Sequence, residues 1–187
     1  PSANLVAFDD GFQNSSSAYT SGSVSSTVSS SGQVYAGTHS LDVTSTANWA
    51  EGGLQRSFTT DATTNILRFR VYRAAGTGAA DLGVRSGGNT IVLEEVNDQH
   101  WRINGQANME GIWNVSSDTW HLVEVDLAAI GATNFEALVY KSWNGTGTFY
   151  FDDVEFTDGF ASASAPASNA APVANGTSAD QTITEGG

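Results

Sequence analysis

The sequence of 187 residues contains no cysteine, one methionine, three prolines and only seven Lys and Arg residues. The lack of cysteine excludes disulfide bridges within the chain and is compatible with any compartment. No apolar run approaches the roughly 20 residues of a membrane-spanning helix, so no membrane span is predicted. The twenty Asp and Glu residues outnumber the cations and give a formal net charge of -13. This charge disfavours nucleic acids and anionic membranes as partners, because both require a cationic surface.

What the chain does contain is typical of β structure. Charged residues are only 14% of the sequence, and Ser, Thr, Gly, Ala and Asn, which favour strands and turns, take their place. Apolar or alternating runs, separated by turn residues, occur at 4–9, 23–30, 38–46, 53–59, 65–73, 80–86, 89–96, 99–104, 119–127, 134–142 and 147–156. Short strands at this spacing predict an all-β fold, a jelly-roll β-sandwich of two antiparallel sheets.

The composition changes after the last of these runs. Residues 1–158 form the predicted sandwich, whereas residues 159–175 are rich in Ala, Ser and Pro and are typical of a flexible linker. Residues 176–187 resemble the truncated opening strand of a cadherin-like or immunoglobulin-like repeat. The chain also begins at Pro1 without a signal segment. We therefore expect a fragment or processed product of a larger secreted protein, in which the sandwich is covalently linked to other domains.

One predicted strand has an unusual polar face. Alternation along residues 65–73 separates an apolar face from a face that carries Arg68, Arg70 and Tyr72. Two arginines are a large share of the cations of so Arg-poor a chain. These three side chains are therefore candidates for contacts with a ligand.

Two acidic pairs lie on the first and last predicted strands, Asp9-Asp10 and Asp152-Asp153. Adjacent strand residues point to opposite faces, so one carboxylate of the second pair is expected to point inward, where an unpaired charge is costly. The pairs are either solvated acids at the rim of the fold or ligands of a hard cation such as calcium, which takes roughly 6–8 oxygen ligands.

Three segments resemble signatures of calcium-stabilised jelly-roll carbohydrate-binding modules, which are attached to secreted bacterial polysaccharide-degrading enzymes. "NLVAFDDGF" is similar to their opening strand, "YAGTHSLDVT" to their Gly and Ser-Leu-x-Val segment, and "FYFDDVEF" to their last strand, in that order. The resemblance implies a structural Ca²⁺ with side-chain ligands from Asp9, Asp10, Asp152 and Asp153 and carbonyl ligands near residues 37–40. It implies a general role in polysaccharide binding without specifying the sugar.

The tryptophans are the strongest candidates for sugar contacts, because sugar C–H groups stack on exposed aromatic rings while hydroxyl groups need polar partners. Trp120 begins an apolar strand and is predicted to lie in the core. The others have small or polar neighbours. The residues predicted to form the sugar site, besides the polar face of residues 65–73, are Trp49, Trp101, Trp113, Gln99 and Asn104.

A catalytic role has weaker support. Glycosidases use two carboxylates about 5–10 Å apart, and Glu124 and Asp126 resemble the start of the Glu-x-Asp-x-x-Glu strand of laminarinase-type hydrolases. Ala129 occupies the position of the third acid. No nucleophile motif, zinc-ligand spacing or phosphate loop occurs either. The sequence favours a protein that is not an enzyme.

We therefore predict a monomeric, non-catalytic module that tethers an attached enzyme to a polysaccharide and so raises its local substrate concentration. A neutral plant or algal glycan such as β-glucan is the first expectation, and agarose- or xylan-type chains are the next. Two alternatives stay open: a structural or adhesive domain without a sugar site, and a polysaccharide hydrolase or lyase. Exposure of the tryptophans distinguishes the first alternative from a binding module.

Overall fold

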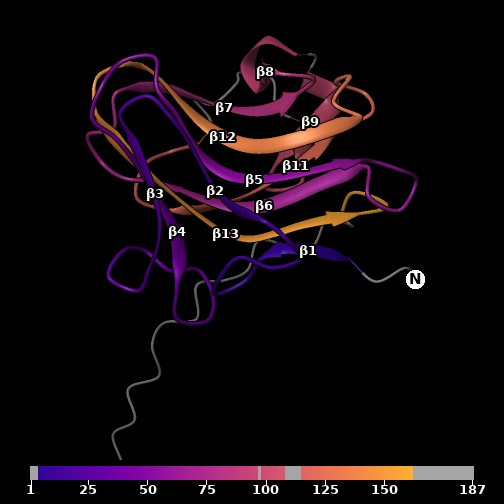
Figure 1. The fold of residues 1–187 in the computed structure, drawn as a ribbon, viewed down its shortest axis with the longest axis horizontal. Coiled ribbons are helices and arrows are strands. Elements are labelled where there is room, and N and C mark those ends of the chain that lie inside the picture. The colour runs from indigo at the N-terminus through magenta and orange to yellow at the C-terminus, as the bar shows by residue number, and fades with distance from the viewer. Residues whose placement is uncertain (1–3, 97, 108–114, 162–187) are drawn as a thin grey trace, which may run out of the picture.

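The computed structural model describes residues 4–96, 98–107 and 115–161. These residues form two antiparallel sheets packed face to face (Figure 1), which confirms the predicted β-sandwich. The larger sheet, sheet A, contains β1 (Leu5–Phe8), β3 (Val24–Ser29), β4 (Ser40–Ser45), β6 (Ile66–Arg73), β9 (Trp101–Ile103), β10 (Gln106–Ala107), β11 (Trp120–Asp126) and β13 (Gly147–Thr157). The smaller sheet, sheet B, contains β2 (Ser17–Ser21), β5 (Glu51–Thr59), β7 (Ala79–Ser86), β8 (Asn89–Val92) and β12 (Asn134–Asn144).

The strand order interleaves the chain. Sheet A runs β10-β9-β11-β6-β13-β4-β3, with β1 also paired to β13, and sheet B runs β2-β5-β12-β7-β8. Two short 3-10 turns, η1 (Leu93–Glu95) and η2 (Asp98–His100), connect β8 to β9. The described residues include no helix long and apolar enough to cross a membrane. The first and last strands lie side by side, as the jelly-roll resemblance implied.

Each run predicted from the sequence contains a strand, and the differences are local. β2 is missing from the prediction because its sequence, "SAYTS", has a single bulky apolar residue, and β10 is only two residues long. The run predicted over 89–96 ends as a strand at Val92 and continues as η1.

The core lies between the sheets and follows the period-two alternation of the strands. Phe69 and Val71 of β6 pack with Phe149 and Phe151 of β13, and all four side chains are buried. A second aromatic group closes one end of the sandwich, where the rings of Phe58, Phe135 and Phe156 meet edge to face or at a tilt, with centroids 4.7–5.7 Å apart.

A bulge in β13 determines where the acidic pair points. Phe151 and Val154 both face the core although they are three residues apart, because the pairing with β6 shifts between Asp152 and Glu155 and Asp153 adopts a φ of 47°. Asp152 is paired with Arg70 on the face away from the core. It is nevertheless fully buried. The expectation of a carboxylate pointing into the core was therefore wrong: a loop on the outside of sheet A buries Asp152.

Candidate functional site

The residues predicted to form one sugar site lie in three different places. Trp101 is 1% exposed and shares the core face of β9 with Ile103. Neither face of its ring is accessible to a ligand, so the prediction that Trp101 stacks on a sugar was wrong. The polar neighbours that suggested exposure lie on the opposite face of the short strand or in the adjoining turns. Trp113 lies outside the described residues.

Of the two hydroxyl partners predicted near Trp101, Asn104 has a structural role. Its Oδ1 accepts a hydrogen bond of 2.9 Å from the Leu122 amide, and its Nδ2 lies 3.0 Å from His121 Nδ1. Asn104 also has a φ of 52°, as expected at the turn between β9 and β10. The second, Gln99, is exposed in η2.

Arg68 lies on the outer face of sheet A, as predicted, but it forms a structural ion-pair network. Its Nε is 3.0 Å from Glu124 Oε1 and its Nη1 is 2.9 Å from Glu155 Oε1. Its Nη2 donates to the Gly159 carbonyl. Glu124 is fully buried and also accepts a bond from the Ala161 amide. Two donors, Arg68 Nε and the Ala161 amide, thus bind Oε1 of the buried Glu124 carboxylate, and all three nitrogens of the Arg68 guanidinium have structural partners.

The same network removes the hydrolase alternative based on Glu124 and Asp126. Glu124 is buried and paired with Arg68, so it cannot reach a glycosidic bond. Asp126 accepts a hydrogen bond from the Ala129 amide, which closes the turn after β11. Both acids have structural partners.

Arg70 and Tyr72 belong to an aromatic cluster on the outer face of sheet A, which also contains Tyr35, Trp120 and Tyr150. Ring centroids lie 5.6–5.8 Å apart along the chain Tyr35–Trp120–Tyr72–Tyr150, and the Arg70 guanidinium lies 4.3 Å from the Tyr35 centroid. Trp120 is half-buried here, so its prediction as a core residue was wrong. Tyr35, at 37%, is the most exposed aromatic residue of the cluster, and the Arg70 guanidinium lies over its ring. The cluster packs the loop of residues 30–39 onto sheet A.

Two of the four predicted metal ligands, Asp10 and Asp152, bind the same loop. Asp152 Oδ2 accepts hydrogen bonds from the Tyr35 and Ala36 amides at 2.9 and 3.2 Å. Asp10 Oδ1 accepts bonds from the Thr38 and His39 amides at 2.5 and 2.7 Å. Backbone donors of one loop thus connect a carboxylate that follows the first strand with a carboxylate of the last strand, which lie side by side.

Electrostatics links these carboxylates further. Burial raises the pKa of Asp152, against the lowering effect of its backbone donors, and the Asp10 charge raises it again. Burial and the charges of Asp152 and Asp9 raise the pKa of Asp153. Negative charge therefore accumulates where the first and last strands meet. Among the described residues, no three acidic, His or Cys side chains come together in a group that could hold a metal ion.

The outer face of sheet B is built differently. Its central row, read across five strands, is Tyr19, Gly53, Val139, Gly83 and Val92. The two glycines, which have no side chains, flank Val139 at the middle of this row. Gly53 has a φ of 154°, and a Cβ there would lie 2.1 Å from the Leu138 carbonyl oxygen, so only glycine fits. The centre of this face is therefore low, between bulkier residues on the outer strands.

Charged side chains of neighbouring rows cross this low centre. Lys141 of β12 is paired with Glu51 of β5 on one side and with Asp81 of β7 on the other. Glu51 binds Arg85 Nη1 at 3.1 Å and Lys141 Nζ at 3.7 Å. Arg85 also lies over the Tyr19 ring, 5.4 Å from its centroid. The network holds charged hydrogen-bonding groups in fixed positions on this face, beside the Tyr19 ring.

Trp49 stands at one end of this face and is 66% exposed, the most exposed large apolar side chain of the described residues. Its backbone adopts a φ of 61°. Its amide donates to the Ser142 carbonyl at 2.9 Å, and the Ser142 hydroxyl donates to the Ala47 carbonyl at 2.7 Å. A side chain with this much exposed apolar area gains little from folding, yet its backbone is firmly held.

Trp143 supports Trp49. The two rings meet edge to face with centroids 4.9 Å apart, an arrangement that leaves a face of Trp49 to the solvent. The Lys141 ammonium lies 5.1 Å from the Trp143 centroid. We call Trp49, Trp143, Lys141, Glu51 and Asp81 the Trp49 surface.

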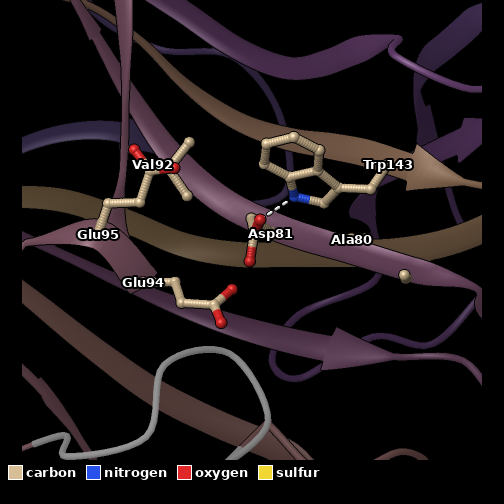
Figure 2. Close-up of a pocket in the computed structure, with 7 residues that line it drawn as sticks. Ala80, Asp81, Val92, Glu94, Glu95 and Trp143 are labelled. Atoms are coloured by element: carbon tan, nitrogen blue, oxygen red, sulfur yellow. Dashed lines mark hydrogen bonds between the residues drawn. The ribbon is translucent and has the colours of Figure 1, made fainter.

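A pocket of about 370 Å³ adjoins the Trp49 surface. It is lined by Ala79, Ala80, Asp81, Val92, Glu94, Glu95 and Trp143. Figure 2 shows Asp81 between the indole of Trp143 and the carboxylate of Glu94, and the Trp143 Nε1 donates a hydrogen bond to Asp81 Oδ2. Burial raises the pKa of Asp81 to about 8, and the neighbouring acids Glu94 and Glu95 act in the same direction.

The Trp49 surface was only partly visible in the sequence. Trp49 was predicted, but its partners Trp143, Lys141 and Asp81 were not. The alternation of Lys141 and Trp143 along β12 places both on one face. Their proximity to Asp81 and Trp49 depends on strand pairing between segments far apart in the sequence, which periodicity does not specify.

No protein-family model and no curated protein sequence matches the chain. Solved structures do. A family 30 carbohydrate-binding module of a cellulosomal cellulase of Clostridium thermocellum has a TM-score of 0.54 at 16% identity, covering 83% of this chain and 97% of that module. The xylan-binding family 22 module of Paenibacillus barcinonensis Xyn10C has a TM-score of 0.51 at 17% identity, covering 84% and 96%. A point variant of a family 29 carbohydrate-binding module has a TM-score of 0.51 at 16% identity, covering 84% and 92%. At these identities the similarities establish the fold.

Proposed function

We propose that the chain is a non-catalytic, monomeric polysaccharide-binding module and that the Trp49 surface is its binding site. The observation that carries the proposal is Trp49, an indole that is 66% exposed on a backbone held by bonds to β12. Such a ring is a preorganised platform for a pyranose, whose hydroxyl groups would meet Glu51, Lys141 and Asp81. The similarly folded carbohydrate-binding modules, one of them a xylan-binding domain, support the same class of ligand.

The ligand we propose is a β-linked glycan of the β-glucan class, with xylan- or agarose-type chains as the next choice. An open sheet face with one exposed indole suits the middle of a chain better than an enclosed site would. In the parent protein, which we propose to be secreted and modular, the module would hold a covalently linked enzyme near its substrate.

Isothermal titration calorimetry of the protein with soluble glycans tests this function. Trp49→Ala should weaken binding at least ten-fold, equivalent to about 1.4 kcal/mol, because the stacking platform is lost. Tyr35→Ala is the matched control and should retain the wild-type affinity, since among the described residues it removes the second exposed large aromatic, which lies on the loop packed against sheet A. Absence of heat with every glycan on folded protein would reject the binding function in favour of a structural domain. Loss of binding in the Tyr35 variant alone would move the site to sheet A.

We also propose a structural Ca²⁺ at the junction of the first and last strands, held by Asp9, Asp10, Asp152 and Asp153 together with loop carbonyl oxygens. The raised pKa values of Asp152 and Asp153 support it, since uncompensated negative charge favours a cation. The ion would cross-link the first and last strands and take no part in ligand chemistry.

Chelation tests the metal. At calcium 100-fold above its dissociation constant the ion adds about 2.7 kcal/mol of stability, so a chelator should lower Tm by about 5–10 °C. Added calcium should restore it. Asp152→Asn should abolish the response to calcium. A Tm that does not respond to chelator or to calcium at neutral pH would rule out the structural ion and leave the sugar site unaffected.

A further inference from the structure

The pocket beside Trp143 is acidic in a way that a site for neutral sugars does not require. Three of its seven lining residues carry carboxylates, Asp81, Glu94 and Glu95, and none carries a cation. A neighbouring cation, Lys141, is engaged outside the pocket. Its Nζ lies 3.7 Å from Glu51 Oε1 and 5.1 Å from the centroid of the Trp143 ring. Lys141 lowers the pKa of Asp81, but less than burial and the neighbouring acids raise it. The pocket thus retains a negative potential.

Asp81 also has an unused oxygen. Its side chain belongs to a residue that is 2% exposed, and its Oδ2 accepts the Trp143 Nε1–H. Its Oδ1 is buried and has no hydrogen-bond partner among the residues that the structure describes. Figure 2 shows this carboxylate directed into the pocket, toward the side where Glu94 stands. A buried carboxylate oxygen without a donor is costly, and a donor from a ligand would remove that cost.

We propose that this pocket binds the protonated amino group of an amino sugar, so that the polysaccharide recognised by the module is a β-linked chain containing glucosamine-type residues. This inference rests on the proposed function and names its ligand class. Binding would displace the proton that Asp81 holds in the free folded protein. The ammonium would then donate to Asp81 Oδ1, meet the charges of Glu94 and Glu95, and lie beside the Trp143 indole, which favours cations. The adjacent sugar would stack on Trp49.

The geometry favours an organic ammonium over the alternatives. Asp81, Glu94 and Glu95 do not form a group that could hold a metal ion. An anionic polysaccharide would meet three carboxylates in the pocket and a chain with a formal net charge of -13. A pocket of about 370 Å³ is larger than an ammonium alone requires and matches a ligand of small-molecule size.

The test compares three oligosaccharides of equal length at pH 6 by calorimetry: a β-1,4-glucosamine oligomer, its N-acetylated form and the corresponding β-1,4-glucose oligomer. The glucosamine oligomer should bind at least ten-fold more tightly than the other two. Asp81→Asn should remove this preference, so that the variant binds the glucosamine and glucose oligomers with affinities within about two-fold of each other. Asp158→Asn, which changes the same charge at an exposed position, is the matched control and should keep the preference.

Each remaining outcome is decisive. Equal binding of all three oligosaccharides, or a preference that survives Asp81→Asn, would overturn the amino-sugar inference while the proposed function stands. Binding of none of them, together with no binding across the wider glycan panel, would refute the function itself. A lysine oligomer that binds as tightly as the glucosamine oligomer, with the same dependence on Asp81, would show general attraction of cations and would also overturn the inference.

Discussion

Asp81→Asn should stabilise the protein, and the gain should depend on pH. Asn keeps the acceptor for the Trp143 indole and can donate toward Glu94, while it removes a carboxylate that is 2% exposed. The pKa of Asp81 rises from its ordinary value of about 4 to about 8. At about 1.4 kcal/mol for each pKa unit, this difference sets a ceiling of about 5–6 kcal/mol. The pocket opens to solvent on one side, so a gain of about 2 kcal/mol is expected.

The sign follows from proton linkage. Between about pH 4 and pH 8 the unfolded chain has released the Asp81 proton, whereas the folded protein still holds it. Folding therefore takes up a proton in this window, and the contribution of Asp81 to stability falls as pH rises. Below about pH 4 the folded and unfolded states both hold the Asp81 proton, so Asp81 causes no loss of stability there. The variant has no such group, so its advantage should grow from pH 5 to pH 8 and then stay constant.

Urea unfolding followed by tryptophan fluorescence at pH 5, 6.5, 8 and 9 measures this difference. The groups that face Asp81 are Glu94 and Glu95 from η1 and Lys141 from β12, and all are unchanged in the variant. Asp158→Asn again serves as the control for reduced net charge and should run parallel to the wild type. A stability difference between Asp81→Asn and wild type that is independent of pH, or a destabilised variant at pH 8, would refute the burial argument.

Three further predictions concern the frame of the site. Trp101→Ala should lower the free energy of unfolding by about 3–5 kcal/mol through a core cavity; a loss under 1 kcal/mol in urea unfolding would contradict the buried placement. Arg68→Met should cost about 3–5 kcal/mol because it leaves the buried Glu124 charge unpaired, and the added Glu124→Gln change should recover part of this cost in the same assay. Gly53→Ala should destabilise by at least about 2 kcal/mol, measured by thermal unfolding, because its Cβ would clash with the Leu138 carbonyl; an unchanged Tm would contradict the geometry.

The fold could be predicted from the sequence because alternation is a local property. Residues 65–73 separate core and outer faces by sequence alone, and the structure places Phe69 and Val71 in the core and Arg68 on the outer face as expected. The exceptions have local causes as well. β2 has almost no apolar alternation to detect, and the bulge at Asp153 breaks the period of two.

The candidate site was predicted less well because exposure is a tertiary property. Trp49 and Trp101 have equally polar neighbours in the sequence, yet one is 66% exposed and the other 1%. The difference arises because Trp101 falls on the inner face of a strand paired with β11, whereas Trp49 lies on a loop fixed outside the sandwich by Ser142. The polarity of the sequence neighbours of a tryptophan therefore does not show whether its own side chain faces the core or the solvent.

The sequence by itself determined that this chain has no disulfides, carries an acidic net charge and folds as a sandwich of short antiparallel strands, because composition and periodicity act locally. It also supplied the indoles and carboxylates of a binding site. Only the tertiary structure decided which of them meet. Pairing of β12 with β5 and β7 brought Lys141 between Glu51 and Asp81, and burial against Glu94 raised the pKa of Asp81. Both effects come from contacts between segments distant in sequence, which no local pattern specifies.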